Sequence, residues 1–167
     1  MEEKQQTVKL TNPVSFALST GFFAGVIWGA VYIIFYYLGF TRIIPGFLAE
    51  PFFAHDTLAS WNGHLIGWLF FILFSILASF VYALLFRKVK GPWFSAVYGI
   101  LWWIIVFLGF GPGAAMMSRA DLRDLNTLLS TLCLFILWGM FIGYTITFEF
   151  TDERIREPFG DRSHERQ

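Results

Sequence analysis

The sequence Ala17-Leu-Ser-Thr-Gly21-Phe-Phe-Ala-Gly25-Val-Ile-Trp-Gly29 lies inside an uncharged apolar run over residues 16–40. Three glycines recur at every fourth position, and Ala17 extends the series by one turn. On an α-helix these positions lie nearly above one another, so the small side chains form a smooth groove. In lipid such a groove lets a second backbone approach closely and gain van der Waals contact. The stretch therefore predicts a membrane helix built for tight packing.

The distribution of charge extends this prediction to the whole chain. Only 14% of the residues are charged, whereas a soluble domain has about a quarter. All 12 Lys and Arg residues and all 12 Asp and Glu residues fall outside four segments, which are 16–40, 65–86, 93–118 and 125–148. Each segment supplies the roughly 20 residues that a helix needs to cross the bilayer. The sequence predicts an all-α integral membrane protein with a bundle of four transmembrane helices.

The expected organisation is one four-helix membrane domain over residues 13–157. Its helices cover about 14–40, 62–86, 93–111 and 125–150, with a cytoplasmic tail at 1–12 and a flexible cytoplasmic tail at 158–167. The connection 41–62 is long, aromatic and interrupted by Pro45-Gly46 and Pro51, so we expect short helical pieces in the interface or folded over the bundle mouth. Three glycines and a proline at 109–113 either end the third helix near Phe110 or break it at membrane depth.

Small residues at a spacing of four occur in all four helices and are the candidate helix-packing positions. The first helix is expected to pack against the second or the fourth, with a right-handed crossing of roughly −40°. Because four helices can satisfy most of these faces within one bundle, self-association through them is permitted but not required. The positions are Ala17, Gly21, Gly25, Gly29, Gly63, Gly67, Ser95, Gly99, Gly139 and Gly143.

Basic residues predict the orientation of the helices. Of the 12 Lys and Arg residues, nine fall on the side of the two termini and of the link after the second helix, and three fall on the other side. By the positive-inside rule both termini are cytoplasmic and the two longer loops are external.

The sharpest candidate for chemistry is an external polar cluster. Its members His55, Asp56 and His64 offer imidazole and carboxylate ligands for a divalent metal. No HExxH or comparable spacing accompanies them, and charges are ordinary where loops meet water, so we expect no metal, no cofactor and no catalytic residue. The cluster consists of Arg42, Glu50, His55, Asp56, His64, Arg119 and Asp121, with Arg123 and Asp124 as further candidate members.

The sequence favours a structural, accessory or partner-binding membrane protein packed through glycine faces. A transporter, channel or lipid-handling protein for an uncharged or hydrophobic solute is the alternative, which the break at 109–113 supports because interrupted helices border substrate sites. The uncharged membrane segments argue against an ion path. A membrane enzyme with an external metal site is the least favoured alternative, because no nucleophile–base pair is evident. A net charge of zero argues against nucleic acid. Besides the lipid bilayer, a membrane-protein partner and a homo-oligomer both stay open.

Several short stretches together resemble a known family. They are Gly-Phe-Phe-Ala-Gly-Val-Ile-Trp-Gly (21–29), Pro-Gly-Phe-Leu-Ala-Glu-Pro-Phe (45–52), Gly-His-Leu-Ile-Gly-Trp (63–68), Gly-Pro-Trp (91–93) and Val-Tyr-Gly (97–99). The pattern resembles the YqhR conserved membrane proteins of Bacillus-type bacteria. The resemblance implies a small multi-pass fold in the bacterial cytoplasmic membrane, and it brings no catalytic or binding residue.

Overall fold

The structure, a computed structural model, describes residues 12–86, 92–111 and 124–155. Its long helices are α1 (Pro13–Tyr37), α3 (Trp61–Leu85), α4 (Pro92–Trp103) with its π-helical continuation η2 (Ile104–Phe110), and α5 (Leu125–Ile155). The connection between α1 and α3 holds two short pieces, η1 (Phe47–Ala49) and α2 (His55–Leu58). Four helices are long and apolar enough to cross a membrane, which confirms the predicted four-helix membrane fold. The predicted terminal tails lie outside the described residues, apart from Asn12.

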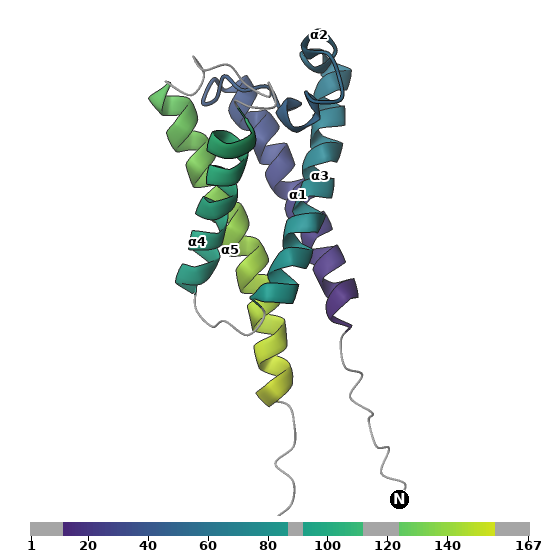
Figure 1. The fold of residues 1–167 in the computed structure, drawn as a ribbon, viewed down its shortest axis with the longest axis vertical. Coiled ribbons are helices and arrows are strands. Elements are labelled where there is room, and N and C mark those ends of the chain that lie inside the picture. Colours follow the sequence, from purple (N-terminus) through teal and green to yellow (C-terminus); the bar gives the residue numbers. More distant parts are fainter. Residues whose placement is uncertain (1–11, 87–91, 112–123, 156–167) are drawn as a thin grey trace, which may run out of the picture.

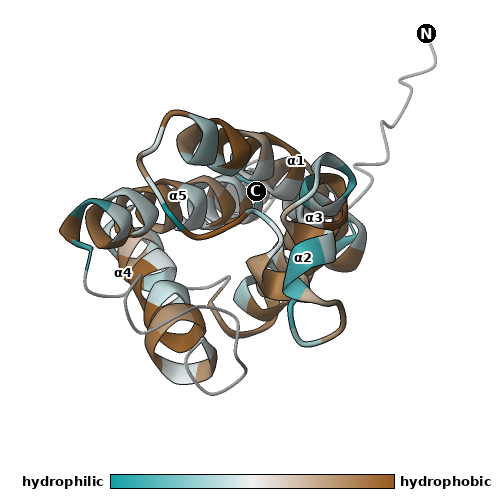
Figure 2. Ribbon diagram, turned by 90° about the horizontal axis from the view of Figure 1, so that it is seen from above, coloured by the Kyte–Doolittle hydropathy of each residue, from teal (hydrophilic) through white to brown (hydrophobic). Residues whose placement is uncertain are grey.

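The four helices alternate in direction, as Figure 1 shows. We call the end of the bundle at which α1 begins and α5 ends the tail end, and the opposite end, with η1 and α2, the loop end. In the view from the loop end, α5 lies between α4 and α1, and the hydrophilic α2 contrasts with the largely hydrophobic long helices (Figure 2). α1 packs chiefly against α3, α4 against α5, and α1 also contacts α5.

α1 ends three residues earlier than the predicted residue 40, for a reason visible in its backbone. Gly39 has a φ of +76°, a conformation that glycine adopts without steric cost. The Gly39 N–H donates to the Tyr36 carbonyl at 3.1 Å, and the Phe40 N–H donates to the Phe35 carbonyl at 2.9 Å. The rings of Phe35 and Phe40 then pack edge to face. This is a Schellman motif, which ends the helix at Tyr37 and directs the chain back toward the bundle.

The glycine series of α1 faces α3. A Cβ atom added at Gly21 would lie 2.6 Å from Ile76 Cα, and one added at Gly25 would lie 2.5 Å from Ile72 Cα. Non-bonded carbons do not approach so closely, so each glycine admits the backbone of α3 where any other residue would push it away. One hydrogen bond crosses the same seam, from Ser79 Oγ to the Ala17 carbonyl at 2.8 Å.

The seam between α4 and α5 places small residues on both helices. A Cβ atom added at Gly139 would lie 2.5 Å from Gly99 Cα, so the two glycines face each other directly. A Cβ atom added at Gly143, one turn further along α5, would lie 2.5 Å from the Cβ atom of Ser95. The backbones of α4 and α5 therefore meet directly at Gly99 and Gly139, and the short side chain of Ser95 lies against Gly143.

α3 and α4 meet through long side chains instead. The Tyr98 hydroxyl donates to the Ala78 carbonyl at 2.6 Å, and the rings of Tyr98 and Tyr82 are 4.9 Å apart. Nearer the middle of the bundle, the rings of Phe74 and Trp102 contact edge to face at 5.0 Å. Aromatic side chains thus bridge the two helices that the shortest link connects.

The axis of the bundle is filled by buried aromatic rings. Phe107, Phe135 and Trp138 are fully buried, and Phe71 nearly so. Phe135 contacts the other three rings at centroid distances of 5.5 to 6.3 Å. The indole N–H of Trp138 donates to Ser75 Oγ at 3.0 Å, which satisfies the one polar group of this layer.

The glycine-rich end of the third span adopts a wider helix before it stops. The Gly111 N–H donates to the Val106 carbonyl at 2.8 Å, a bond across five residues that defines the π-helical stretch η2. η2 ends at Phe110, which is the first of the two alternatives for 109–113, and residues 112 and 113 lie outside the described part of the chain.

Candidate functional site

The connection between α1 and α3 folds into the mouth of the bundle at the loop end. Ile43, Phe47, Ala49 and Leu58 are buried, and Phe47 is fully buried. The ring of Phe47 contacts Tyr32 of α1 at 5.4 Å and Phe107 of η2 at 5.6 Å. Phe47 therefore closes the mouth and joins the aromatic layer along the axis.

Two glycines of α3 lie directly against the backbone of this connection. A Cβ atom added at Gly63 would lie 2.5 Å from the carbonyl carbon of Leu58, and one added at Gly67 would lie 2.6 Å from the backbone nitrogen of Gly46. Both were expected to pack against another membrane helix, and the structure corrects that expectation. A four-residue spacing predicts a groove, but it carries no information about which backbone fills the groove.

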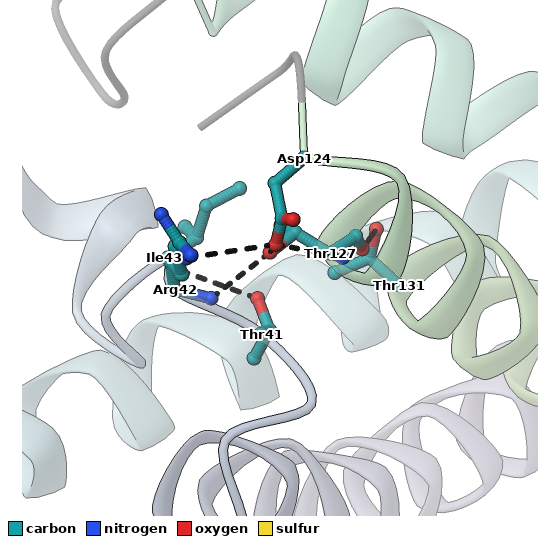
Figure 3. Close-up of polar contacts among 6 residues, drawn as sticks. All are labelled: Thr41, Arg42, Ile43, Asp124, Thr127 and Thr131. Atoms are coloured by element: carbon teal, nitrogen blue, oxygen red, sulfur yellow. Dashed lines mark hydrogen bonds and ion pairs between the residues drawn. The ribbon is translucent and has the colours of Figure 1, made fainter. Parts of the chain in front are cut away.

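A polar latch, formed by Arg42, Asp124 and Thr127, ties the connection to the start of α5 (Figure 3). The backbone N–H of Arg42 donates to Thr127 Oγ1 at 3.1 Å, and the Thr127 hydroxyl donates to Asp124 Oδ2 at 2.7 Å. The same carboxylate oxygen accepts the Thr127 N–H at 3.3 Å and lies 3.7 Å from Arg42 Nε. Asp124 thus caps α5 and holds the connection with one oxygen atom.

The hydrogen bonds of the latch continue into the bundle. Thr131 Oγ1 donates to the Thr127 carbonyl at 2.7 Å and accepts the indole N–H of Trp103 at 3.1 Å. On the other side, the Ile43 N–H donates to Thr41 Oγ1 at 3.2 Å. One run of hydrogen bonds therefore links the connection, the first turns of α5 and the junction of α4 with η2.

Glu50 and His55 form a second polar pair at the loop end. His55 Nδ1 lies 2.6 Å from Glu50 Oε1. The side chain of Glu50 is only 7% exposed, whereas that of His55 is 68% exposed. The Glu50 carboxylate is therefore buried, and the exposed His55 is its hydrogen-bond partner.

His64 lies in a third environment, among aromatic rings. Its residue is 4% exposed, and its Nδ1 lies 2.9 Å from the Tyr37 hydroxyl. The rings of Tyr36 and Tyr37 contact the imidazole edge to face at 5.2 and 5.5 Å, and that of Trp61 lies at 6.5 Å. Nε2 has no hydrogen-bond partner among the described residues. His64 belongs to the α1–α3 contact rather than to a ligand set.

The predicted external cluster is therefore divided among different contacts. Arg42 joins Asp124, Glu50 joins His55, Asp56 is exposed and His64 is buried, while Arg119 and Asp121 lie outside the described residues. Within residues 12–86, 92–111 and 124–155, no three His, Cys, Asp or Glu side chains stand close enough to hold a metal ion. The metal-site hypothesis for His55, Asp56 and His64 gains no support from this geometry.

Sequence reasoning named Arg42 of the latch but missed the threonine hydroxyls that connect it to α5. Asp124 was considered as a further charge of the external cluster and not as a helix cap, and Thr127, Thr131 and Thr41 were not singled out. One signal was available, because an Asp placed three residues before a Thr at the start of an apolar run is typical of a helix N-cap. The contact between Arg42 and Asp124 had no such signal, since 82 positions separate the two residues.

A hollow of about 410 Å³ opens on the side of the bundle, away from the loop end. Its walls come from α1, α4 and α5, all of which are candidate membrane spans. The lining combines apolar side chains with three hydroxyl groups, and it consists of Trp28, Ser95, Leu137, Met140, Phe141, Tyr144 and Thr145.

Comparison with known proteins places this fold in a family. A model of the family "Conserved membrane protein YqhR" matches residues 1–159. The protein named "Uncharacterized protein YqhR" from Bacillus subtilis (strain 168) is 33% identical over 159 residues, which cover 91% of this chain and 84% of that protein. No solved structure matches. The match over nearly the whole chain confirms the resemblance seen in the sequence, and the chain belongs to the YqhR family of conserved membrane proteins.

Proposed function

We propose that the protein is an accessory membrane protein that acts by binding other membrane components, and that it is neither a conduit nor an enzyme. One observation carries this proposal: the aromatic layer of Phe71, Phe107, Phe135 and Trp138 fills the bundle axis, and Phe47 closes its mouth. Close-packed rings at the axis leave no path for a solute without a large rearrangement.

The same packing limits how a partner can bind. Gly21 and Gly25 receive α3, Gly99 and Gly139 receive each other, and Gly67 receives the connection. These grooves are occupied within one chain, so a partner or a second copy would contact the outward faces of the helices instead. The outward faces carry the exposed Leu, Ile, Phe and Val side chains that lipid also contacts.

Lipid handling is the second candidate function, because of the lateral hollow. Its volume of about 410 Å³ is within the range of small-molecule pockets. At membrane depth the molecules that meet it are lipids or other apolar solutes, which matches the uncharged substrate class expected from the sequence.

We further propose that the protein lies in the bacterial cytoplasmic membrane with its tail end in the cytoplasm. The excess of nine over three basic residues and the membership of the family support this arrangement. With Cys133 replaced by alanine, a membrane-impermeant maleimide applied to intact cells should label D56C and leave K4C unlabelled. The reverse pattern would place the loop end in the cytoplasm.

The test of the accessory function has two arms. Proteoliposomes of the wild type should take up uncharged solutes such as glycerol no faster than protein-free liposomes. F47A, which lacks the ring at the bundle mouth, is measured beside the wild type to detect a leak through the mouth. Faster uptake by the wild type would contradict the proposal. Photocrosslinking in native membranes should yield one reproducible larger complex, and co-purification of a single lipid species without any protein would favour lipid handling instead.

A further inference from the structure

The turn between η1 and α2 exposes two aromatic side chains. Phe52 is 73% exposed, Phe53 is also exposed, and Pro51 precedes them. Immediately before this turn the chain is buried, because Phe47 and Ala49 lie in the bundle mouth. The fold therefore anchors the base of the turn inside the protein and directs its two rings outward.

The position of the turn along α3 indicates its depth. The ring of Phe52 lies 5.7 Å from that of Phe70, and the ring of Phe53 lies 6.2 Å from it. Phe70 is nine residues after Trp61, the first residue of α3, which corresponds to about 14 Å along the helix axis. The turn thus lies beside the apolar span of α3, well below the start of that helix.

The turn also continues an existing lipid-facing surface. One side of α3 carries exposed leucines at every fourth position, and the partly buried Phe70 borders this row between Leu69 and Leu73. Within a membrane span such a row contacts acyl chains. The leucines are Leu65, Leu69, Leu73 and Leu77.

Glu50 and His55 lie at the two ends of the turn, and their contact lowers the cost of placing the Glu50 carboxylate near hydrocarbon. A carboxylate near hydrocarbon is costly unless it is hydrogen-bonded. Glu50 is withdrawn from water and its carboxylate lies 2.6 Å from His55 Nδ1, while the exposed side of His55 faces outward. The pair also closes the chain from residue 50 to residue 55, which holds the intervening residues as a compact turn.

We propose that residues 50–55 form a lipid anchor, in which Phe52 and Phe53 insert among the acyl chains just below the headgroups at the loop end and the Glu50–His55 pair holds them there. The partner is the bilayer itself. This anchor fixes the connection that closes the bundle mouth to the membrane, and it operates whichever function the protein performs.

Spin-label accessibility in liposomes tests the depth of the turn. The full chain carries C133A together with F52C, F53C or D56C, and power saturation compares oxygen with a water-soluble nickel chelate. Labels at 52 and 53 should be relaxed more by oxygen, and the label at 56, which is exposed at α2, more by nickel. Equal nickel accessibility at all three positions would overturn the proposal and assign the aromatic turn to a partner in water.

A second variant tests the pair. In the F52C background, H55A should raise nickel accessibility at residue 52 severalfold, because an unpaired Glu50 draws the turn toward water, and H55Q should restore the oxygen preference through its amide donor. D56N, one position further along, is the matched control and should change nothing. An unchanged oxygen preference in H55A, with unaltered melting in detergent, would refute the holding role of the pair.

Discussion

The α4–α5 and α1–α3 seams both bring two helices close together through glycines, but they place those glycines differently. In the α4–α5 seam Gly99 and Gly139 face each other, so both backbones lie at the contact. In the α1–α3 seam the glycines stand on α1 alone, and α3 supplies large residues such as Ile72 and Trp68. The same spacing of small residues thus produces either a contact between glycines of both helices or a one-sided groove, in which the glycines of α1 receive the backbone of α3 at Gly21 and Gly25 and the side chain of Trp68 at Gly29.

The one-sided seam itself changes along its length. At Gly25 an added Cβ atom would meet Ile72 Cα, a backbone atom that moves only with the helix. At Gly29 it would meet the indole of Trp68, whose Nε1 would be 2.8 Å away, and an indole can rotate. Tolerance of substitution should therefore increase from Gly99 to Gly25 to Gly29.

The largest effect is expected for G99L, which places a bulky side chain between two backbones. Over-packing costs about 1–3 kcal/mol where neighbours can adjust, and here they cannot, so we expect a loss of at least about 3 kcal/mol. Unfolding in mixed detergent micelles measures it, with V97L on the exposed side of α4 as the control. Equal stability of G99L and V97L would show that α4 and α5 do not meet through Gly99.

G25L should be the next most damaging change. The leucine would separate α1 from α3, and a destabilisation of about 3 kcal/mol is expected, with a larger size in detergent as the helices part. I27L, at an exposed position two residues away, should melt like the wild type. Unchanged melting and size in G25L would argue against the α1–α3 seam.

A pair of alanine variants separates the two positions of the one-sided seam. Alanine favours a helix over glycine by about 1 kcal/mol, and this gain opposes the steric cost at both sites. We expect G29A to change stability by less than about 1 kcal/mol, because Trp68 can turn aside, and G25A to lose clearly more. If both alanines behaved alike, the assumed rigidity of the contact at Ile72 would be wrong.

The smallest effect is expected for S79A, which removes the hydroxyl that bonds to the Ala17 carbonyl. Hydrogen bonds between membrane helices contribute about 0.6 kcal/mol on average, so the loss should be near that value. Because Ser75 bonds to Trp138 near the bundle axis, S75A leaves a buried indole N–H without its partner and should cost more. A reversal of this order would place the more important hydrogen bond in the seam.

The membrane class and the four spans could be predicted because hydrocarbon excludes charge along about 20 residues at a time. The groove on α1 was equally readable from Gly21, Gly25 and Gly29. The partner of the groove was not, since spacing alone left two helices as candidates. The same limit explains the error at Gly63 and Gly67, whose groove holds the backbone of the connection.

The loop end was the least predictable region. The pair of Arg42 and Asp124 and the contact of Phe47 with Phe107 depend on where separate segments meet, which no local pattern in one sequence encodes. The end of α1 was misplaced because Gly39 continues an apolar run while its positive φ stops the helix. The pair of Glu50 and His55 is close in sequence, but its burial follows from the descent of the turn along α3.

The order of the helices along the chain has a consequence for biosynthesis. α1 finds its principal neighbour in α3, the next span to be made, and α4 finds its own in α5. Each half of the protein is thus a hairpin whose principal helix–helix contact forms within about 75 consecutive residues. During translation the first hairpin can therefore form in the membrane before the second has been synthesised. The two finished hairpins then pack against each other, in part through the aromatic side chains of α3 and α4.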